Sequence, residues 1–417
     1  MALKRVVVTG LGALTPIGNS ANEFRESMYK GISGAVPITR FDTSLFKTKF
    51  ACELKGFDAG NYFDRKEARK MDPYCQYAMV AADEAIQDSG LDLEKIDKDQ
   101  VGVLMSSGVG GMGTFEDEIA AYHTGDGTPR FSPFFVPKMI SDIASGQVSI
   151  KYGFRGPNYC TVAACASSTI SLINAFDHIR LGRATIMVAG GSEAPITTAG
   201  IAGFNALHAL STRNDDYLTA SRPFDLDRDG FVIAEGAGCL ILEDYEHAVN
   251  RGAKIYCEIV GGGLSADAYH LTAPHPEGLG AALVMANALK DANLQPEAID
   301  YINVHGTSTG LGDVTEPAAI LSVFKDHAYK LSISSTKSMH GHLLGAAGAI
   351  EAIACVFALL DGQIPPTINH FTDDPQIDNN LDFTFNQAKS REVKYALSNT
   401  FGFGGHNASL ILKKMDA

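Results

Sequence analysis

Short apolar stretches typical of strands alternate along the chain with longer stretches that have the periodicity of helices. Helices are predicted around 74–89, directly after Cys165, at 280–292 and at 343–361. The strand-like runs are KRVVVTG, VGVLMSSG, ATIMVAGGSE, CLILED, IYCEIVGGG, IDYINVHGTS, KLSISSTKS, ALSNTFGFGG and ASLILKK. This alternation predicts a layered α/β protein, and several strands end in small residues, where ligands usually bind.

The length of the chain allows one very large core or two domain-sized ones. At 417 residues and 45% hydrophobic composition, the chain is globular rather than disordered. We expect two halves, 1–253 and 254–417. Because no Pro-rich, Ser-rich or low-complexity linker separates them, the halves are expected to share a core.

Composition narrows the functional classes. The first apolar run, after MALKR, is too short for a signal peptide, and no run of about 18 apolar residues occurs, so we expect a soluble cytoplasmic protein without a membrane partner. The seven cysteines are scattered without CxxC pairs, which argues against disulfides and structural zinc. The formal charge of -14 disfavours nucleic acid as a partner.

The glycine-rich segment VTGLGALTPIGN follows the first strand but lacks the dinucleotide pattern. Thr15 and Pro16 stand where the third glycine would be expected, and no phosphate-binding G-x-x-x-x-G-K-[ST] occurs in the chain. We therefore predict a tight structural turn around Gly10 and Gly12, and no nucleotide cofactor.

Small residues surround Cys165 in the segment PNYCTVAACASSTISL. A thiol at the start of a helix lies at the positive end of the dipole, which favours the thiolate nucleophile. The alternative is a buried, inert cysteine, and Cys160 is the natural control.

The segment NVHGTSTGLGD places His305, Thr307, Thr309 and Asp313 at a strand end. Hydroxyls two residues apart on an extended segment face the same side and could bind a linear, amide-bearing ligand. An ordinary loop with turn-forming residues is an equal alternative.

Lysine and histidine gather in STKSMHGHLLGAAG, which contains Lys337, His340 and His342, with Glu351 on the helix that follows. A metal site is disfavoured because no carboxylate or cysteine completes the set at short spacing. Gly345 and Gly348 are interpreted as positions of close helix packing.

The last glycine-rich segment, NTFGFGGHN, sets Phe401 and Phe403 among glycines. Flexible backbone beside large apolar side chains suits a gate over an apolar pocket, with amides that stabilise an oxyanion. A plain hairpin turn is the alternative.

Twelve segments in this order resemble the β-ketoacyl-acyl carrier protein synthases of the condensing-enzyme family, with synthase II as the most similar branch. They are VVVTGLGALTPIGN, FDRKEARKMD, SSGVGGMG, SPFFVPKMI, ACASS, VAGGSEA, ALSTRNDD, SRPFDLDRDGFVIAEGAG, SADAYHLTAP, HGTSTGLGD, STKSMHGHLLGAAGA and SNTFGFGGHN. The resemblance implies a thiolase-like, five-layered α-β-α-β-α fold of two pseudo-repeated halves. It also implies a homodimer that extends acyl chains by decarboxylative Claisen condensation with malonyl-acyl carrier protein, without metal or cofactor.

The resemblance also implies residue roles. The nucleophile would be Cys165, in the half 1–253; the half 254–417 would carry the other catalytic groups, His305, His342 and Lys337, supported by Glu351 and Asp313. The amides of Cys165 and Phe403 would form the oxyanion hole, with Phe403 as acyl gate. Substrate-binding positions would be Thr307, Thr309, Phe401 and Val109, the last controlling the depth of the acyl pocket.

A basic island is expected to bind the acidic carrier protein. Lys66, Arg69 and Lys70 have the spacing of one helix face, and Arg130 and Arg213 extend the set; an ordinary solvated helix that pairs with Asp64 and Glu67 is the alternative.

The chain departs from the common family pattern at three positions. His340 and His406 stand where Thr is frequent, and Gly310 replaces a proline. Because the family histidine directly precedes LLGAAG, His342 keeps the catalytic role and His340 is expected to be structural.

Three rival functions fit less well. A degradative thiolase carries a second cysteine near its C-terminus, whereas no cysteine follows Cys355; a non-catalytic chain-length subunit lacks the nucleophile. A cysteine hydrolase needs water access that an apolar gate restricts.

Overall fold

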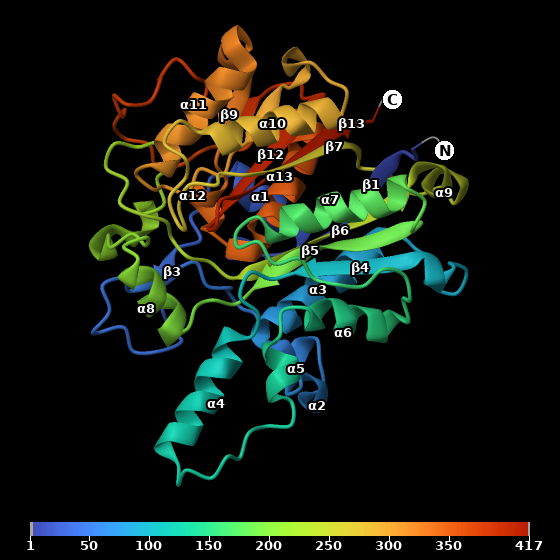
Figure 1. Cartoon of the computed structure of the whole chain (residues 1–417), viewed down its shortest axis with the longest axis vertical. Coiled ribbons are helices and arrows are strands. Elements are labelled where there is room, and N and C mark those ends of the chain that lie inside the picture. Colours follow the sequence, from blue (N-terminus) through green and yellow to red (C-terminus); the bar gives the residue numbers. More distant parts are fainter. Residues whose placement is uncertain (1–2, 416–417) are drawn as a thin grey trace.

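The computed structural model describes residues 3–415, and its apolar runs form a large central sheet (Figure 1). Within these residues nine strands are joined in the order β4-β5-β6-β1-β7-β13-β12-β8-β9. Their bounds are β1 Val6–Leu14, β4 Val101–Ser106, β5 Ile186–Glu193, β6 Gly236–Asp244, β7 Cys257–Ala266, β8 Tyr301–Asn303, β9 Ser332–Ser334, β12 Tyr395–Gly402 and β13 His406–Lys414. Short strands form two further pairs, β2 Val36–Pro37 with β3 Phe50–Ala51 and β10 Gln363–Ile364 with β11 Lys389–Ser390.

Helices cover both faces of the sheet. The α-helices are α1 Ala21–Tyr29, α2 Arg65–Ala68, α3 Pro73–Asp88, α4 Met112–Thr124, α5 Phe135–Met139, α6 Ile143–Tyr152, α7 Ser167–Arg180, α8 Thr198–Ala206, α9 Tyr245–Asn250, α10 Leu279–Asp291, α11 Gly312–Phe324, α12 Lys337–His340 and α13 Ala347–Asp361. The 3-10 turns are η1 Ala59–Asn61, η2 Lys98–Gln100, η3 Asn214–Thr219, η4 Pro296–Ala298, η5 Lys325–Tyr329 and η6 Leu344–Ala346. The four helices predicted from periodicity are confirmed; α1, α4, α5, α6, α8, α9, α11 and α12 were not predicted.

The sheet repeats one pattern in its two halves. β4 and β5 are parallel, and β6 and β1 then follow antiparallel; β8 and β12 are likewise parallel, followed by antiparallel β13 and β7. The halves meet where Val6–Val8 pair with Cys257–Ile259. The division expected between 253 and 254 falls in the connection from α9 to β7.

Two helices lie between the halves. α7 and α13 contact strands of both halves, α3 and α6 cover the outer face of the β4-β5-β6-β1 half, and α10, backed by α11, covers the outer face of the other (Figure 1). The succession of helix, sheet, helix, sheet and helix gives the five layers predicted from the sequence.

The central layer is built from strongly apolar sequence. One helical segment, Leu344–Asp361, is long and apolar enough to cross a membrane, with a mean hydropathy of 1.8, but 89% of it is buried inside the protein. Because Glu351 lies within it, this segment is not an uninterrupted apolar run in the sequence. Its burial explains the composition as that of a core helix.

The glycines of the first strand correct one sequence interpretation. Gly10 and Gly12 lie within β1, not in a turn. A Cβ atom built on Gly12 would lie only 1.9 Å from the carbonyl oxygen of Ala81 in α3. The glycines therefore allow α3 to pack directly on the strand backbone.

Candidate active site

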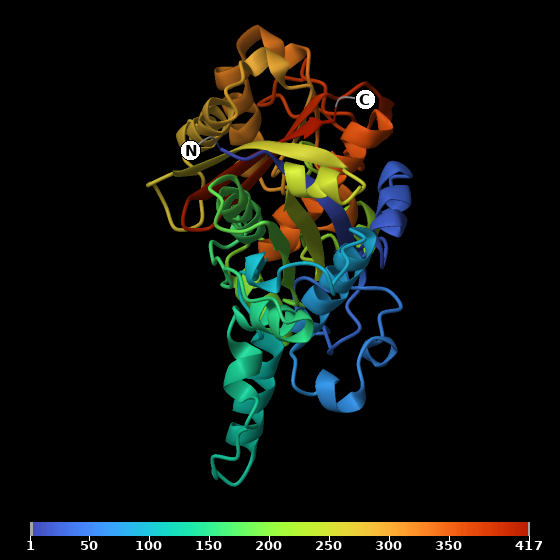
Figure 2. The same ribbon diagram turned by 90° about the vertical axis from the view of Figure 1, so that its right-hand side faces the viewer.

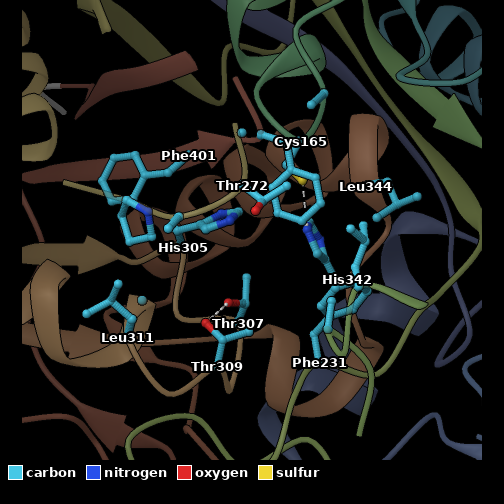
Figure 3. Close-up of a pocket in the computed structure, with 18 of the residues that line it drawn as sticks. Cys165, Phe231, Thr272, His305, Thr307, Thr309, Leu311, His342, Leu344 and Phe401 are labelled. Atoms are coloured by element: carbon cyan, nitrogen blue, oxygen red, sulfur yellow. Dashed lines mark hydrogen bonds between the residues drawn. The ribbon is translucent and has the colours of Figure 1, made fainter. Parts of the chain in front are cut away.

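The thiol of Cys165 is presented by a strained turn immediately before α7. Ala164, which precedes it, has φ +49°, in the left-handed region that non-glycine residues rarely adopt. The turn brings Cys165 Sγ to 3.0 Å from His342 Nε2 (Figure 3). Such a turn between a strand-like segment and a helix exposes a nucleophile to a cavity.

Burial acts against the thiolate that the helix start favours, so that expectation stays a prediction. Burial raises the pKa of Cys165 to about 12. The charge of Lys337 and a hydrogen bond from the Phe403 backbone N–H act in the opposite direction. Thiolate formation therefore requires groups that stabilise the anion when the substrate arrives.

Two imidazoles, the buried His342 and the half-buried His305, face the same end of the cavity. The rings of His305 and His342 are 5.3 Å apart, centre to centre, at 86° (Figure 3). Burial, followed by the charge of Lys337, lowers the pKa of both well below the usual histidine value. Both rings are therefore neutral at physiological pH.

The two histidines are held by their backbones. His342 N–H donates to Val232 O at 2.7 Å, and the Phe231 ring packs 5.2 Å from its own. Glu316 accepts from His305 N at 3.0 Å and from Gly306 N at 2.9 Å. These contacts fix the backbone segments that carry the two rings.

A buried ion pair lies behind the two histidines. The Lys337 ammonium donates to Glu351, and both side chains are almost completely buried. Burial raises the pKa of Glu351 to about 7, against the lowering effect of Lys337. Neither residue lines the cavity, so Lys337 acts on the site through its charge.

The gate segment is both a hairpin turn and a wall of the cavity. Phe403, Gly404 and Gly405 connect β12 to β13, whose last pair is Gly402 with His406. A Cβ atom on Gly402 would lie 2.6 Å from Ala163 O, so only glycine lets this strand approach the nucleophile turn. The half-buried Phe403 ring contacts that of Phe204 at 6.4 Å.

The cavity has a volume of about 430 Å³ and a mainly apolar lining. Cys165, both histidines, Val109, Thr307, Thr309, Phe401 and Phe403 all line it. Thr307 Oγ1 and Thr309 Oγ1 are 3.0 Å apart, across the cavity from Cys165 (Figure 3). The cavity thus joins a nucleophile, two N–H donors and a pair of hydroxyls.

Asp313 does not line the cavity. Its carboxylate accepts from Phe224 N at 2.9 Å and from Ser308 N at 3.1 Å, and it lies 3.8 Å from Arg228. It holds the loop that carries the two threonines and does not face the reacting atoms.

His340 also lies outside the cavity, although it is two residues from His342. Its Nδ1 lies 2.7 Å from Gly341 O and its Nε2 3.0 Å from Thr336 Oγ1, and its ring packs beside Phe24. The short helix α12 followed by Gly341, at φ +72°, turns the two histidines to different surroundings.

The basic residues expected to bind the carrier protein lie on several surface segments. α2 ends at Ala68, so Arg69 and Lys70 lie beyond the helix, which corrects the shared helix face. Lys66 and Arg69 are exposed, whereas Lys70 pairs with Glu67 at 2.6 Å. Arg130 pairs with Asp126, and the partly buried Arg213 donates to Asp227 O.

Several residues of the site were missed from the sequence. Thr272 and Asp267 line the cavity from the segment SADAYHLTAP, and Glu316 supports His305. Arg228 donates to the carbonyls of Thr309 and Gly310, which fixes the threonine loop. No local pattern marked Glu316 or Arg228, because each acts on a residue in another segment of the chain.

Geometry alone also permits a metal ion. The ligand atoms of Cys165, His305 and His342 lie within 4.8 Å of one another, and a Cys/His₂ set suits zinc. The expected absence of a metal therefore stays a prediction. The contact between Sγ and Nε2 favours a thiol nucleophile.

Comparison with known proteins covers both halves of the chain. The family model "Beta-ketoacyl synthase, N-terminal domain" matches residues 3–248, and "Beta-ketoacyl synthase, C-terminal domain" matches residues 256–371. The chain is 50% identical over 411 residues to 3-oxoacyl-[acyl-carrier-protein] synthase 2 of Synechocystis sp., which covers 99% of this chain and 98% of that one. It is 51% identical over 415 residues to the synthase of the same name from Staphylococcus aureus, strain COL, with 99% of both chains covered.

Solved structures agree with the fold. An ishigamide ketosynthase/chain length factor superposes with a TM-score of 0.93 at 36% identity, covering 100% of both chains. A type II PKS ketosynthase in complex with its acyl-carrier protein has a TM-score of 0.92 at 37% identity, covering 99% of this chain and 100% of that one. The predicted thiolase-like fold class is confirmed.

Proposed function

The chain belongs to the β-ketoacyl synthase family, and we propose that Cys165, His305 and His342 carry out its reaction, the elongation of an acyl chain by decarboxylative condensation with malonyl-acyl carrier protein. The carrying observation is the 3.0 Å contact between Cys165 Sγ and His342 Nε2, with His305 beside it in an apolar cavity. The products are 3-oxoacyl-acyl carrier protein, CO₂ and free carrier protein.

In the first half-reaction, Cys165 Sγ attacks the carbonyl carbon of an acyl thioester. The developing sulfur anion is stabilised by the His342 Nε2–H and the charge of Lys337. The carbonyl oxygen becomes an oxyanion bound by the backbone amides of Cys165 and Phe403. The bond to the carrier thiol breaks, and that thiol leaves with the proton of Cys165.

In the second half-reaction, the malonyl thioester loses CO₂. The electron pair of the broken C–C bond forms an enolate. Its oxygen accepts hydrogen bonds from the N–H groups of His305 and His342. This needs neutral rings with hydrogen on Nε2, and the Nδ1 atoms of both rings have no hydrogen-bond partner within residues 3–415. The α-carbon then attacks the acyl carbon, and the C–S bond to Cys165 breaks. The sulfur leaves as a thiolate and takes up one proton from solvent, which restores the thiol.

The threonine pair is proposed to bind the pantetheine arm of the carrier protein. Thr307 and Thr309 each offer a hydroxyl on one side of the cavity, and their loop is fixed by Asp313 and Arg228. Hydroxyls donate to and accept from the amides of such an arm.

The acidic carrier protein is proposed to bind at the exposed cations Lys66 and Arg69, with Lys70, Arg130 and Arg213 extending the surface. These cations are local positive charges on a chain of net charge -14, and such charges attract an acidic partner. That a similar ketosynthase has been solved in complex with its acyl-carrier protein supports this assignment.

We further propose a homodimer that works in the cytoplasm, away from membranes and nucleic acids. The hairpin of α4 and α5 projects from the body (Figure 2) and exposes Phe115, Phe134 and Val136, with exposed fractions of 48%, 39% and 55%. Apolar surface of this kind is normally covered by a partner. Light scattering should then give twice the chain mass of 44.4 kDa.

The condensation is tested by following both products. With acyl- and malonyl-carrier protein, the enzyme should release one CO₂ for each 3-oxoacyl product that is longer by two carbons. A thiolase reaction would instead form a 3-oxoacyl product without CO₂ release. A hydrolase would release free fatty acid, and either result would contradict the proposal.

A further inference from the structure

Glu193 is a completely buried carboxylate at the end of β5 that the reaction described above does not use. Its Oε1 accepts from Ser107 Oγ at 2.6 Å and from Val109 N at 3.2 Å. Its Oε2 accepts from Gly108 N at 2.8 Å and from Gly345 N at 2.9 Å. All these partners are uncharged donors.

The four donors match the chemistry of a carboxylate. An ionised carboxylate only accepts hydrogen bonds and has about four lone-pair sites on its two oxygens. A glutamine at this position would keep one oxygen and turn an NH₂ group toward two N–H or O–H donors. The position therefore requires Glu, although no reacting atom touches it.

Glu193 joins two walls of the acyl cavity. Val109 lines one wall, and its loop is braced again by Gly110 N, which donates to Ser107 Oγ at 2.8 Å. Leu344 lines another wall at φ +46°, a strained conformation for a residue with a branched side chain. Gly345, directly after it, is held by Glu193.

The two walls also touch each other near the nucleophile. A Cβ atom on Gly345 would lie 2.3 Å from Gly108 N, and one on Gly108 would lie 3.3 Å from Ala164 O. The Val109 loop, the Leu344 turn and the turn before Cys165 are therefore packed around one carboxylate. A shift of either wall has to change the hydrogen bonds of Glu193.

We propose that Glu193 is a positioning residue that sets acyl-chain selectivity, because it ties the Val109 loop and the Leu344 turn into one wall. This inference rests on the proposed condensing function of the cavity. The clamped wall limits the depth of the pocket, and a long acyl chain enters fully only when the wall yields. Weakening the clamp therefore favours long chains over short ones.

The test compares Glu193→Gln with the wild type in the acylation half-reaction. Intact-mass spectrometry follows adduct formation on Cys165 from hexanoyl- and palmitoyl-carrier protein. In the variant, the palmitoyl rate relative to the hexanoyl rate should rise by about tenfold, a size typical of altered apolar pocket contacts. A ratio that is unchanged or lower, or an equal fall of both rates, would overturn the proposal.

Two further variants keep the result interpretable. Ser107→Ala removes one donor and should shift the ratio in the same direction by about threefold, even if Glu193→Gln does not fold. Glu243→Gln changes another fully buried carboxylate, bonded to Thr9, His247 and Arg251, and should leave the ratio unchanged. An equal shift in Glu243→Gln, or none in Ser107→Ala, would contradict the assignment. Absence of any adduct in the wild type would instead refute the proposed function.

Discussion

The residues proposed for catalysis, here called the floor, and those proposed for carrier docking, here called the rim, are built in opposite ways. The floor is formed by Cys165, His305, His342, Lys337 and Glu351, of which His305 is half-buried and the other four are buried. It is held together by contacts between separate segments, such as Cys165 with His342 and Lys337 with Glu351. The rim, formed by Lys66, Arg69, Lys70 and Arg130, lies on a short helix and loops. Its ion pairs are local, such as Lys70 with Glu67 and Arg130 with Asp126.

This difference separates chemistry from recognition. A group buried without water interacts strongly with its neighbours, so removing it disturbs both stability and reaction. Exposed charges are screened and contribute mainly to the rate and specificity of encounter. Substitutions in the floor should therefore have large effects on every substrate, whereas those in the rim should have small effects confined to carrier-bound substrates.

The largest effect should separate the two neighbouring histidines. His342→Ala removes a donor to the enolate oxygen and should lower condensation by about 10²–10³-fold. His340→Thr keeps a hydroxyl near Thr336 and leaves the cavity lining intact, so most activity should remain. Steady-state condensation assays on both variants measure the contrast. Equal losses of condensation activity in the two variants would mean that His340 also takes part in the reaction.

The buried ion pair should dominate stability. Lys337→Met leaves Glu351 buried without its cation and should lower the free energy of unfolding by about 3–5 kcal/mol. Urea denaturation measures this change, and Lys30→Met, which breaks the exposed pair with Glu26, is the control that should leave the midpoint unchanged. Equal midpoints for the two variants would contradict the distinction between floor and surface.

The acidity of Cys165 should appear in its alkylation. Because the thiol pKa is raised to about 12, the thiolate fraction grows throughout the accessible range as the pH rises. The rate of iodoacetamide modification of Cys165 should increase about tenfold per pH unit between roughly pH 6 and pH 10, without a plateau. A plateau near neutral pH would show that the resting enzyme already holds a thiolate.

The smallest effect is expected at the rim. Charge reversal at Lys66 and Arg69 should lower kcat/KM for acyl-carrier protein by about tenfold, mostly through KM, because attraction to the acidic partner becomes repulsion. Turnover of a small acyl thioester without carrier protein should not change. Equal losses on both substrates would contradict the docking assignment. Added salt should reduce the difference in kcat/KM between wild type and variant.

The sequence predicted the elements and the candidate residues better than their surroundings. Strands and core helices have clear periodicity, and the order of the motifs identified Cys165, His305 and His342 as candidates. Periodicity could not show that Gly12 packs under α3, or that α2 ends at Ala68. The packing of α3 on Gly12 is a contact between distant segments, and α2, with four residues, is too short for periodicity to fix its end.

The electrostatics of the floor were the least accessible from sequence. The position of Cys165 at a helix start suggested a thiolate, whereas burial raises the pKa of its thiol. Nothing in the sequence indicated a role for Glu193, because its four hydrogen-bond donors come from two other segments of the chain. Such convergence is a property of the folded chain only.

The most direct test of the account is the acyl adduct itself. After incubation with acyl-carrier protein alone, intact-mass and peptide analysis should find one acyl group per chain, attached to Cys165, and none in Cys165→Ala. Cys160, five residues earlier and partly exposed, serves as the internal comparison. An adduct that persists in Cys165→Ala, or that lies on Cys160, would contradict the assigned nucleophile.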